Sequence, residues 1–152
     1  MKIETFKSKV AYEEDYFLWL LETANHLKNR DFLGLDVANL LEEIEDMARR
    51  QKQAVKSNLR ILLMHLLKYQ YQPGKRSNSW KATIREHRNR LEDNFADSPS
   101  LKNYFEEVLS ECYSKARNLA SDETNLPINT FPSELPFTLQ EVLDFDYLPN
   151  KN

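Results

Sequence analysis

The chain has 152 residues, of which 30% are charged and 41% are hydrophobic, and its formal net charge is −3. This composition is typical of a globular protein and excludes a chain that is disordered throughout. A net charge so close to zero predicts neither a general nucleic-acid binder nor a protein that coats membrane surfaces. Only two glycines are present, which disfavours a fold built from many hairpins.

The same sequence limits where the protein works. Charged residues interrupt every apolar run before it is long enough to span a bilayer, so no membrane partner is expected. The first residues contain no apolar core of the kind that a secretory signal needs. Cys112 is the single cysteine and cannot form an internal disulfide, so we expect a cytoplasmic protein.

The first half of the chain predicts two helical regions. Apolar residues recur at helical spacing from Tyr12 to about Arg30, and Asp36 is a suitable N-cap for a second helix. No glycine or proline occurs between Val37 and Tyr69. One apolar stripe runs through this region, and its members are Val37, Leu41, Ile44, Ala48, Val55, Leu59, Leu62 and Leu66. Residues 36–70 therefore form one long helix or two collinear ones, and residues 59–70, apolar nearly all round, form a buried central post.

The second half predicts two more helices and an extended tail. Pro73 and Gly74 end the central post, and Asn78 or Ser79 caps the next helix. Ser98 and Pro99 are expected to open the following helix, which ends at Asn125 in the left-handed conformation. In the tail, Thr138 and Glu141 match a capping box.

The expected architecture is all-α, a bundle of four or five helices with an extended C-terminal segment wrapped over it. We predict a single domain over residues 1–152, with the bundle at about 12–125 and the C-terminal strap at 126–149. The large apolar residues of the strap, such as Phe131, Phe137 and Tyr147, favour packing over a solvated tail.

Three polar residues point inward on these helices: His65, His87 and Cys112. Imidazole and thiolate groups both suit zinc, so these residues are weak candidates for a metal site. No helix offers the paired spacing by which one helix supplies two ligands. The alternative is that the histidines are neutral and hydrogen-bonded, and that Cys112 is a small core residue.

The acidic run at residues 42–46 invites a catalytic interpretation, but its helical geometry favours a solvated face. Glu42 and Asp46 point away from the apolar stripe, beside Arg49, as in surface ion pairs. Glu43 and Glu45 lie at the margins of the stripe, where either could reach a histidine or an arginine.

A basic patch occupies residues 68–90, which carry a net charge of +6 against −9 for the rest of the chain. Its candidate binding residues are Lys75, Arg76, Lys81, Arg85 and Arg88. Such a stripe could neutralise phosphates of a nucleic acid. We favour the alternative that it complements the acidic tail or a partner protein, because the total charge is negative.

Several blocks of the sequence resemble one family. They are DYFLWLLETANHLKNRDFLGLDVANLLEEIEDM, LRILLMHLLKYQYQP, SWKATIREHR and FPSELPFTLQEVLDFDYLP. Together, over about Tyr12 to Pro149, they are similar to the bacterial domain-of-unknown-function family twenty-nine, best known from cyanobacteria. The resemblance implies an all-helical, single-domain bacterial protein without an established biochemical role, and it supplies no catalytic or ligand residues.

Three functions therefore remain open. The leading hypothesis is a non-catalytic protein–protein interaction or adaptor domain. Its expected partner is a protein, and whether the chain also forms a homo-oligomer is an open question. The alternatives are a metal-dependent helical-bundle enzyme that uses His65 and His87, and a nucleic-acid binder that uses the basic stripe at residues 75–90. The sequence identifies no cofactor.

Overall fold

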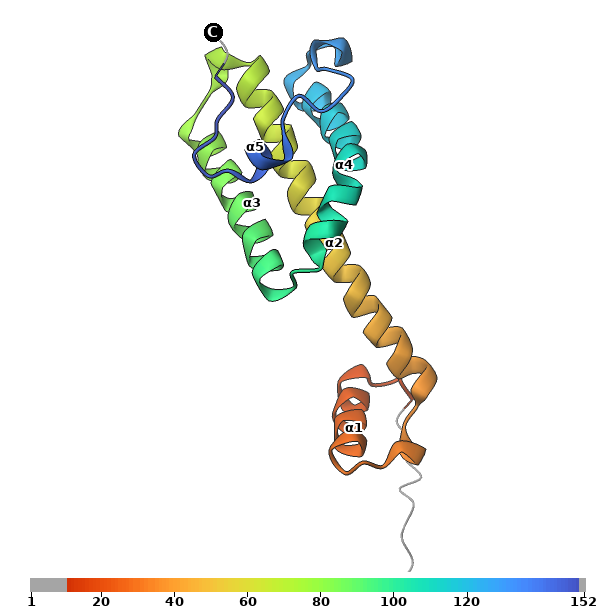
Figure 1. Ribbon diagram of the computed structural model, residues 1–152. Coiled ribbons are helices and arrows are strands. Elements are labelled where there is room, and N and C mark those ends of the chain that lie inside the picture. The colour runs from red at the N-terminus through yellow and green to blue at the C-terminus, as the bar shows by residue number, and fades with distance from the viewer. Residues whose placement is uncertain (1–10, 151–152) are drawn as a thin grey trace, which may run out of the picture. The chain divides into compact units, whose positions relative to one another are not determined.

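The computed structural model describes residues 11–150 and shows an all-α fold (Figure 1). Five α-helices occur in this part of the chain, and no strand does. They are α1 (Tyr16–Lys28), α2 (Val37–Tyr71), α3 (Asn78–Asp97), α4 (Leu101–Thr124) and α5 (Leu139–Leu143). Three short 3₁₀ turns lie between them, η1 (Phe32–Gly34), η2 (Pro73–Lys75) and η3 (Ile128–Thr130). None of the described helices is both long and apolar enough to cross a membrane.

The chain divides into two compact units, Met1–Arg49 and Arg50–Asn152, which share helix α2. We call them the N-terminal unit and the C-terminal unit. The question of one helix or two over residues 36–70 is answered by α2, which is a single helix of 35 residues. The expectation of one domain stays a prediction.

The N-terminal unit consists of α1, η1 and the start of α2. The Asp15 carboxylate caps α1 by accepting from the Leu18 amide at 3.0 Å. Arg30 has a φ of 54°, and this left-handed residue turns the chain out of α1. The predicted N-cap of α2 is confirmed, because Asp36 Oδ1 accepts from the Asn39 amide at 3.2 Å.

The C-terminal unit is built around the second half of α2. α3 and α4 lie along this half, and the C-terminal segment crosses between them (Figure 1). Val55, Leu59, Leu62 and Leu66 are fully buried, together with residues of α3, α4 and the segment after α4. The predicted central post at residues 59–70 is therefore confirmed as the core of this unit.

Three predicted helix starts are wrong. α1 begins at Tyr16, after a turn at residues 12–14, and not at Tyr12. α3 is capped by Ser77, whose Oγ accepts from the Trp80 amide at 3.2 Å, and not by Asn78 or Ser79. α4 begins at Leu101, two residues after Pro99. The amide of Leu101 binds the Ser98 carbonyl at 3.0 Å, so the proline lies in a turn that precedes the helix. In contrast, Asn125 ends α4 with a φ of 57°, as predicted.

The C-terminal strap is part of the fold. Phe131, Phe137 and Val142 are buried in the same core as α2, α3 and α4. The capping box of Thr138 and Glu141 is present at the start of α5. Side chains of α4 also hold the strap, since Tyr113 Oη donates to the Pro132 carbonyl at 2.5 Å and Arg117 Nε to the Phe131 carbonyl at 3.0 Å.

Candidate functional site

Three arginines of the basic patch, Arg76, Arg85 and Arg88, contact the protein's own C-terminal strap. Arg88 is only 2% exposed, and its three guanidinium nitrogens donate to the backbone carbonyls of Glu141, Val142 and Tyr147 at 2.8–3.0 Å. Two of these carbonyls belong to α5, so Arg88 also caps the C-terminal end of that helix. Burial lowers the pKa of Arg88 to about 10, which still leaves the side chain charged at neutral pH.

Two further members of the patch contact the strap. Arg76 donates to the carbonyls of Tyr69, at 2.7 Å, and Pro149, at 3.2 Å. Arg85 lies over the ring of Phe145, with 6.0 Å between its guanidinium carbon and the ring centroid. Lys75 and Lys81 are exposed. We expected the patch to pair with acidic side chains of the tail. Its arginines instead contact backbone carbonyls and one ring of the strap, whereas Lys68 of the same patch does pair with an acidic side chain, Glu123.

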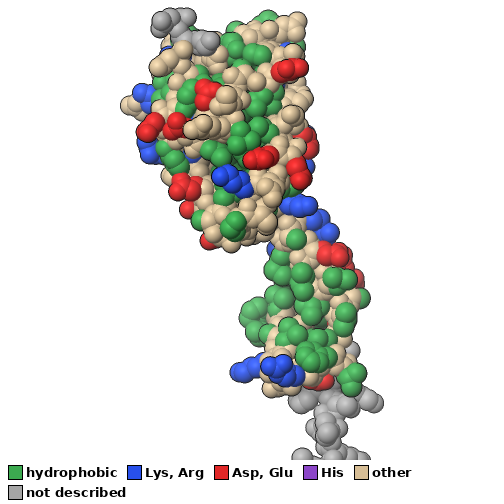
Figure 2. Space-filling model, viewed as in Figure 1, with side chains coloured by type: hydrophobic (Ala, Val, Ile, Leu, Met, Phe, Trp, Pro, Cys, Tyr) green, Lys and Arg blue, Asp and Glu red, His purple; other side chains and the backbone are tan. Residues whose placement is uncertain are grey.

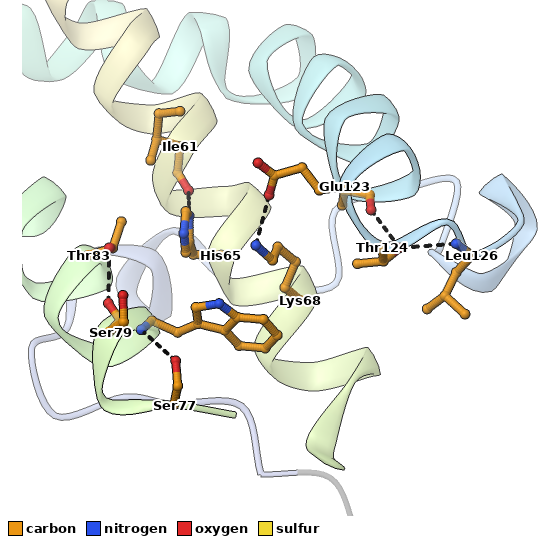
Figure 3. Close-up of polar contacts among 11 residues, drawn as sticks. Ile61, His65, Lys68, Ser77, Ser79, Thr83, Glu123, Thr124 and Leu126 are labelled. Atoms are coloured by element: carbon orange, nitrogen blue, oxygen red, sulfur yellow. Dashed lines mark hydrogen bonds and ion pairs between the residues drawn. The ribbon is translucent and has the colours of Figure 1, made fainter. Parts of the chain in front are cut away.

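His65 and His87 lie near each other in the C-terminal unit, and both are half-buried. His65 Nδ1 is 2.9 Å from the Ile61 carbonyl (Figure 3), which can only accept, so Nδ1 carries the proton. His87 Nδ1 likewise donates to Asn58 Oδ1 at 3.0 Å. Burial is the main cause that lowers the pKa of both imidazoles. A nearby cation lowers each pKa further, Lys68 for His65 and Arg90 for His87.

The third candidate metal ligand belongs to the core. Cys112 is 1% exposed, and its Sγ is 3.9 Å from the Lys56 carbonyl. Burial raises the pKa of this thiol above its ordinary value, which disfavours the thiolate that binds metals. Within residues 11–150, no group of three or more His, Cys, Asp or Glu side chains is placed to hold a metal ion. The structure therefore does not bring His65, His87 and Cys112 together as a ligand set.

Lys68 joins three helices of the C-terminal unit beside His65. Its ammonium group is 2.8 Å from Glu123 Oε2 on α4 (Figure 3) and 4.7 Å from the centroid of the Trp80 ring on α3. The Lys68 side chain is only 12% exposed, so this pair is shielded from solvent more than ordinary surface pairs are. Its role is to hold the helices together.

The acidic side chains of residues 42–46 divide into surface residues and one buried residue, as their positions around the helix indicate. Arg49 pairs with Asp46 on the surface, and also approaches Glu45 at 4.0 Å. Glu43 is 6% exposed and accepts hydrogen bonds from Tyr12 and, at 2.6 Å, from Tyr16. The bond to Glu43 raises the pKa of Tyr12 to about 12. We expected an inward glutamate to reach a histidine or an arginine, and did not foresee the tyrosines.

A second polar cluster in the N-terminal unit surrounds Gly34. His26 Nδ1 is 3.0 Å from Asp31 Oδ2, and a Cβ at Gly34 would lie 2.5 Å from the His26 ring. A side chain at this position would displace that imidazole and the Asp31 carboxylate. A cavity of about 70 Å³ adjoins the cluster, which is a size that suits water more than a substrate.

A larger groove, of about 400 Å³, lies along α3 and the strap in the C-terminal unit. Phe95, Leu143 and Phe145 give it an apolar lining, and Glu92 and Lys102 also border it. Arg88 borders the groove as well, but each of its guanidinium nitrogens already donates to a strap carbonyl. The groove is therefore a concave apolar surface, and its lining alone does not identify a ligand.

The most unusual surface is the one that sequence reasoning missed. Thirteen large hydrophobic side chains are exposed in the described chain, and twelve of them fall within residues 16–47. They are Tyr16, Phe17, Leu18, Leu20, Leu21, Leu27, Phe32, Leu33, Val37, Leu41, Ile44 and Met47. Hydrophobic side chains cover much of the face of the N-terminal unit that Figure 2 shows. We call these twelve residues the apolar surface.

The signal for this surface is present in the sequence, in the helical spacing of Tyr16, Phe17, Leu20 and Leu27. That spacing predicts a face turned to the core, whereas the buried residues of α1 are Trp19 and Thr23. Trp19 packs against the ring of Tyr12, with centroids 4.8 Å apart. The small aromatic core of the N-terminal unit thus uses one side of α1 and leaves the rest of its apolar residues uncovered.

The sequence matches the family described as Domain of unknown function DUF29 over residues 11–148. The chain belongs to the DUF29 family. No curated protein and no solved structure matches it. The match takes in both units of the DUF29 chain, the N-terminal unit with its apolar surface and the C-terminal unit with its strap.

Proposed function

We propose that this DUF29 chain is a non-catalytic protein–protein interaction domain, and that its binding site is the apolar surface of the N-terminal unit. The single observation that carries the proposal is the concentration of exposed large hydrophobic residues within residues 16–47. Leu33 is 99% exposed and Phe17 is 69% exposed, although both types of side chain are usually buried.

The size of the surface supports a macromolecular partner. Large side chains of this kind bury on the order of 150 Å² each, so the twelve, about half exposed, present on the order of 1,000 Å² in total over α1, η1 and the start of α2. The largest apolar patch on a monomeric protein is about 300–600 Å², and larger patches mark interaction sites. An exposed apolar surface of this area suits a protein better than a small molecule, which takes a concave pocket of about 300–1,000 Å³.

The C-terminal unit differs from the N-terminal unit in this respect. Leu119 is the one large hydrophobic residue exposed among its described residues. Two of its charged side chains, Arg88 and Lys68, contribute to holding α3, α4 and the strap in place. We therefore assign the C-terminal unit a supporting role. We also place the protein in the cytoplasm, because the free thiol of Cys112 is compatible with a reducing compartment.

The test is a quantitative affinity capture from the native cell with three versions of the tagged full chain. The wild type is compared with Phe17→Ser combined with Leu41→Ser, and with a control, Leu119→Ser, that removes an exposed leucine outside the surface. We expect proteins that the wild type and the control retain to be lost from the double variant. Equal retention by all three versions would contradict the proposal.

A further inference from the structure

We infer that the occupant of the apolar surface is a positively charged amphipathic helix of another protein, whose lysine or arginine side chains pair with acids beside the surface. This inference rests on the proposed function and adds to it the chemistry of the partner. Three properties of the N-terminal unit support it: its net charge, the acids that the fold does not use, and the helical spacing of its exposed apolar residues.

The N-terminal unit is the acidic part of the chain. Residues 1–49 contain 11 acidic and six basic residues, a net charge of −5, whereas residues 50–152 carry a net charge of +2. Within residues 11–49, where all of the apolar surface lies, the net charge is −7. A surface of this sign repels nucleic acids, anionic lipids and the N-terminal unit of a second copy, whereas it attracts a cationic protein.

Three acids of this unit are not used by the fold. Glu13, Glu14 and Glu42 are exposed, and no side-chain hydrogen bond or ion pair joins them to another described residue. Carboxylates that are exposed and unpaired in this way can accept charge-assisted hydrogen bonds from the cations of a partner. Other acids of the unit do have a partner within the chain, namely Asp15, Asp31, Asp36, Glu43 and Asp46.

On α2, acids lie along one side of the exposed apolar stripe. Leu41 and Ile44 are 53% and 52% exposed, and Glu42 and Glu45 follow them directly in the sequence. At about 100° per residue, Glu45 lies about 70° from the centre of the stripe and Glu42 about 130°, on the same side. The Glu45 side chain is 57% exposed and approaches Arg49 only at 4.0 Å. A helix packed on this stripe therefore has carboxylates along one of its edges.

The start of α1 combines the same two features. Glu13 and Glu14 are exposed in the turn that precedes α1. Phe17 and Leu18, in the first turn of the helix, are 69% and 38% exposed. Exposed apolar side chains with acids beside them in the sequence thus occur at two places in the N-terminal unit, which favours a partner that is both apolar and cationic.

The spacing of the exposed apolar residues indicates a helical partner. Val37, Leu41 and Ile44 recur at helical spacing and are each more than half exposed. The ridges and grooves of such a stripe accept the side chains of a second helix, which presents apolar anchors at positions i, i+3, i+4 and i+7. Lysine or arginine beside those anchors reaches carboxylates across the contact, as charged residues do at the edges of paired helices.

The first experiment uses two synthetic peptides of about 18 residues, or five helical turns, as probes. Both carry leucine at the anchor positions and alanine elsewhere, and their flanking positions are lysine in one peptide and glutamate in the other. We expect the purified full chain to bind the lysine peptide at least about tenfold more tightly, and the difference to shrink as salt is added. Isothermal titration calorimetry measures both affinities. Equal binding of the two peptides, or binding of neither, would overturn the inference.

The second experiment locates the acids that pair with the peptide. Glu42→Gln with Glu45→Gln should weaken binding of the lysine peptide about fivefold, because two exposed carboxylates are neutralised. The matched control is Glu106→Gln with Glu107→Gln, which neutralises two exposed acids on α4 and should retain the wild-type affinity. Equal affinities of the two variants would overturn the pairing.

The third experiment asks whether a second copy is the occupant instead. Leu41→Ser with Ile44→Ser should leave the circular dichroism unchanged, because both side chains are already exposed, and should abolish binding of the lysine peptide. Sedimentation equilibrium of the wild-type full chain should give the 18.0 kDa of one chain. A wild-type mass of twice this value that falls to that of one chain in the double variant would identify a second copy as the occupant and overturn the inference.

The outcomes separate this inference from the proposed function. A chain that binds neither peptide, but whose captured proteins are lost on Phe17→Ser with Leu41→Ser, would overturn the cationic helix as occupant and retain an interaction domain. Equal capture of proteins by the wild type, this double variant and the Leu119→Ser control would contradict the proposed function itself, whatever the peptides show.

Discussion

The two halves of helix α2 carry the same apolar stripe in opposite environments. Val55, Leu59, Leu62 and Leu66 are fully buried, whereas Val37, Leu41 and Ile44 are each more than half exposed. The spacing of these residues along the helix is continuous, so the pattern alone predicts one covered face from end to end. Hydrophobic periodicity thus states which face of a helix has to be covered, and does not state which chain covers it.

What covers the second half is visible in the C-terminal unit. α3, α4 and the strap all contribute to one core with residues 55–69, and Arg88, Arg117 and Tyr113 tie the strap's backbone to the helices. The first half has α1 as its neighbour in the N-terminal unit. Their contact includes a buried polar cluster, Glu43 with Tyr12 and Tyr16, which lies away from the stripe.

The largest expected effect comes from removing the strap. Deleting residues 127–152 takes away Phe131, Phe137 and Val142, at about 1.5–3 kcal/mol for each buried side chain. The sum is comparable to the whole stability of a small domain, so the C-terminal unit should unfold near room temperature. The two tryptophans report on the units separately: Trp80 in a Trp19→Phe background follows the C-terminal unit, and Trp19 in a Trp80→Phe background follows the N-terminal unit.

The strap deletion should affect these two signals unequally. We expect the thermal transition seen by Trp80 to disappear and the one seen by Trp19 to shift less, since no strap residue contributes to the aromatic cluster around Trp19. An unchanged Trp80 transition would show that the strap adds no stability, and that α3 and α4 alone account for the covered half of α2.

The next effect compares the two halves of the stripe with one substitution. Leu62→Ala should lower the free energy of unfolding by about 2–5 kcal/mol, because the residue is fully buried and leaves a cavity. Leu41→Ala should change it by less than about 0.5 kcal/mol in the isolated chain, since the side chain is 53% exposed. Urea denaturation at high dilution, where a dimer would dissociate, measures both values. Similar losses from the two substitutions would show that the first half is covered within one chain.

A smaller effect tests how the strap is held. Arg88→Met should cost about 2–3 kcal/mol, because one buried and two half-buried carbonyls lose their donor. The matched control on the same helix is Arg85→Met, which removes a contact to the Phe145 ring and should cost less than about 1 kcal/mol. Denaturation followed by Trp80 fluorescence distinguishes them. An equal, small cost for both would mean that apolar packing alone fixes the strap.

Much of the fold is accessible from the sequence for identifiable reasons. The absence of glycine and proline from residues 37–69 predicts a long helix, and Asp36, Asn125 and Thr138 are capping residues with a local chemistry. The predicted starts of α3 and α4 are wrong because Ser77, Asn78 and Ser79 are all good caps, and because Pro99 fits a turn as well as a first helical position.

The candidate site and the role of the basic patch are less accessible from the sequence, because they depend on tertiary contacts. In the sequence Arg88 is one member of a basic stripe, and only the folded chain shows that it binds three strap carbonyls more than fifty residues away. The apolar surface looks identical to a core face in the sequence, since helical spacing carries no information on which neighbour is present. Its exposure depends on the fold of α1 against α2, which no local pattern encodes.

The smallest expected effect is the pH dependence of stability that the histidines cause. Of the three histidines, His65 and His87 lie in the C-terminal unit and His26 lies in the N-terminal unit. Burial lowers the pKa of His65 and of His87 in the folded state, below the ordinary value of about 6.5 that the unfolded chain retains. As the pH falls below about 6.5, the unfolded state binds protons first, so the C-terminal unit loses stability until the lowered folded pKa values are passed. Above that window both imidazoles are neutral in the folded and in the unfolded state, so they no longer change the stability with pH.

We expect His65→Gln with His87→Gln to flatten this pH dependence in Trp80-monitored urea denaturation, whereas His26→Gln should leave it unchanged. A wild-type C-terminal unit whose stability does not fall between neutral pH and pH 5 would contradict the burial of the two imidazoles, and with it the distinction between the covered and the uncovered half of α2.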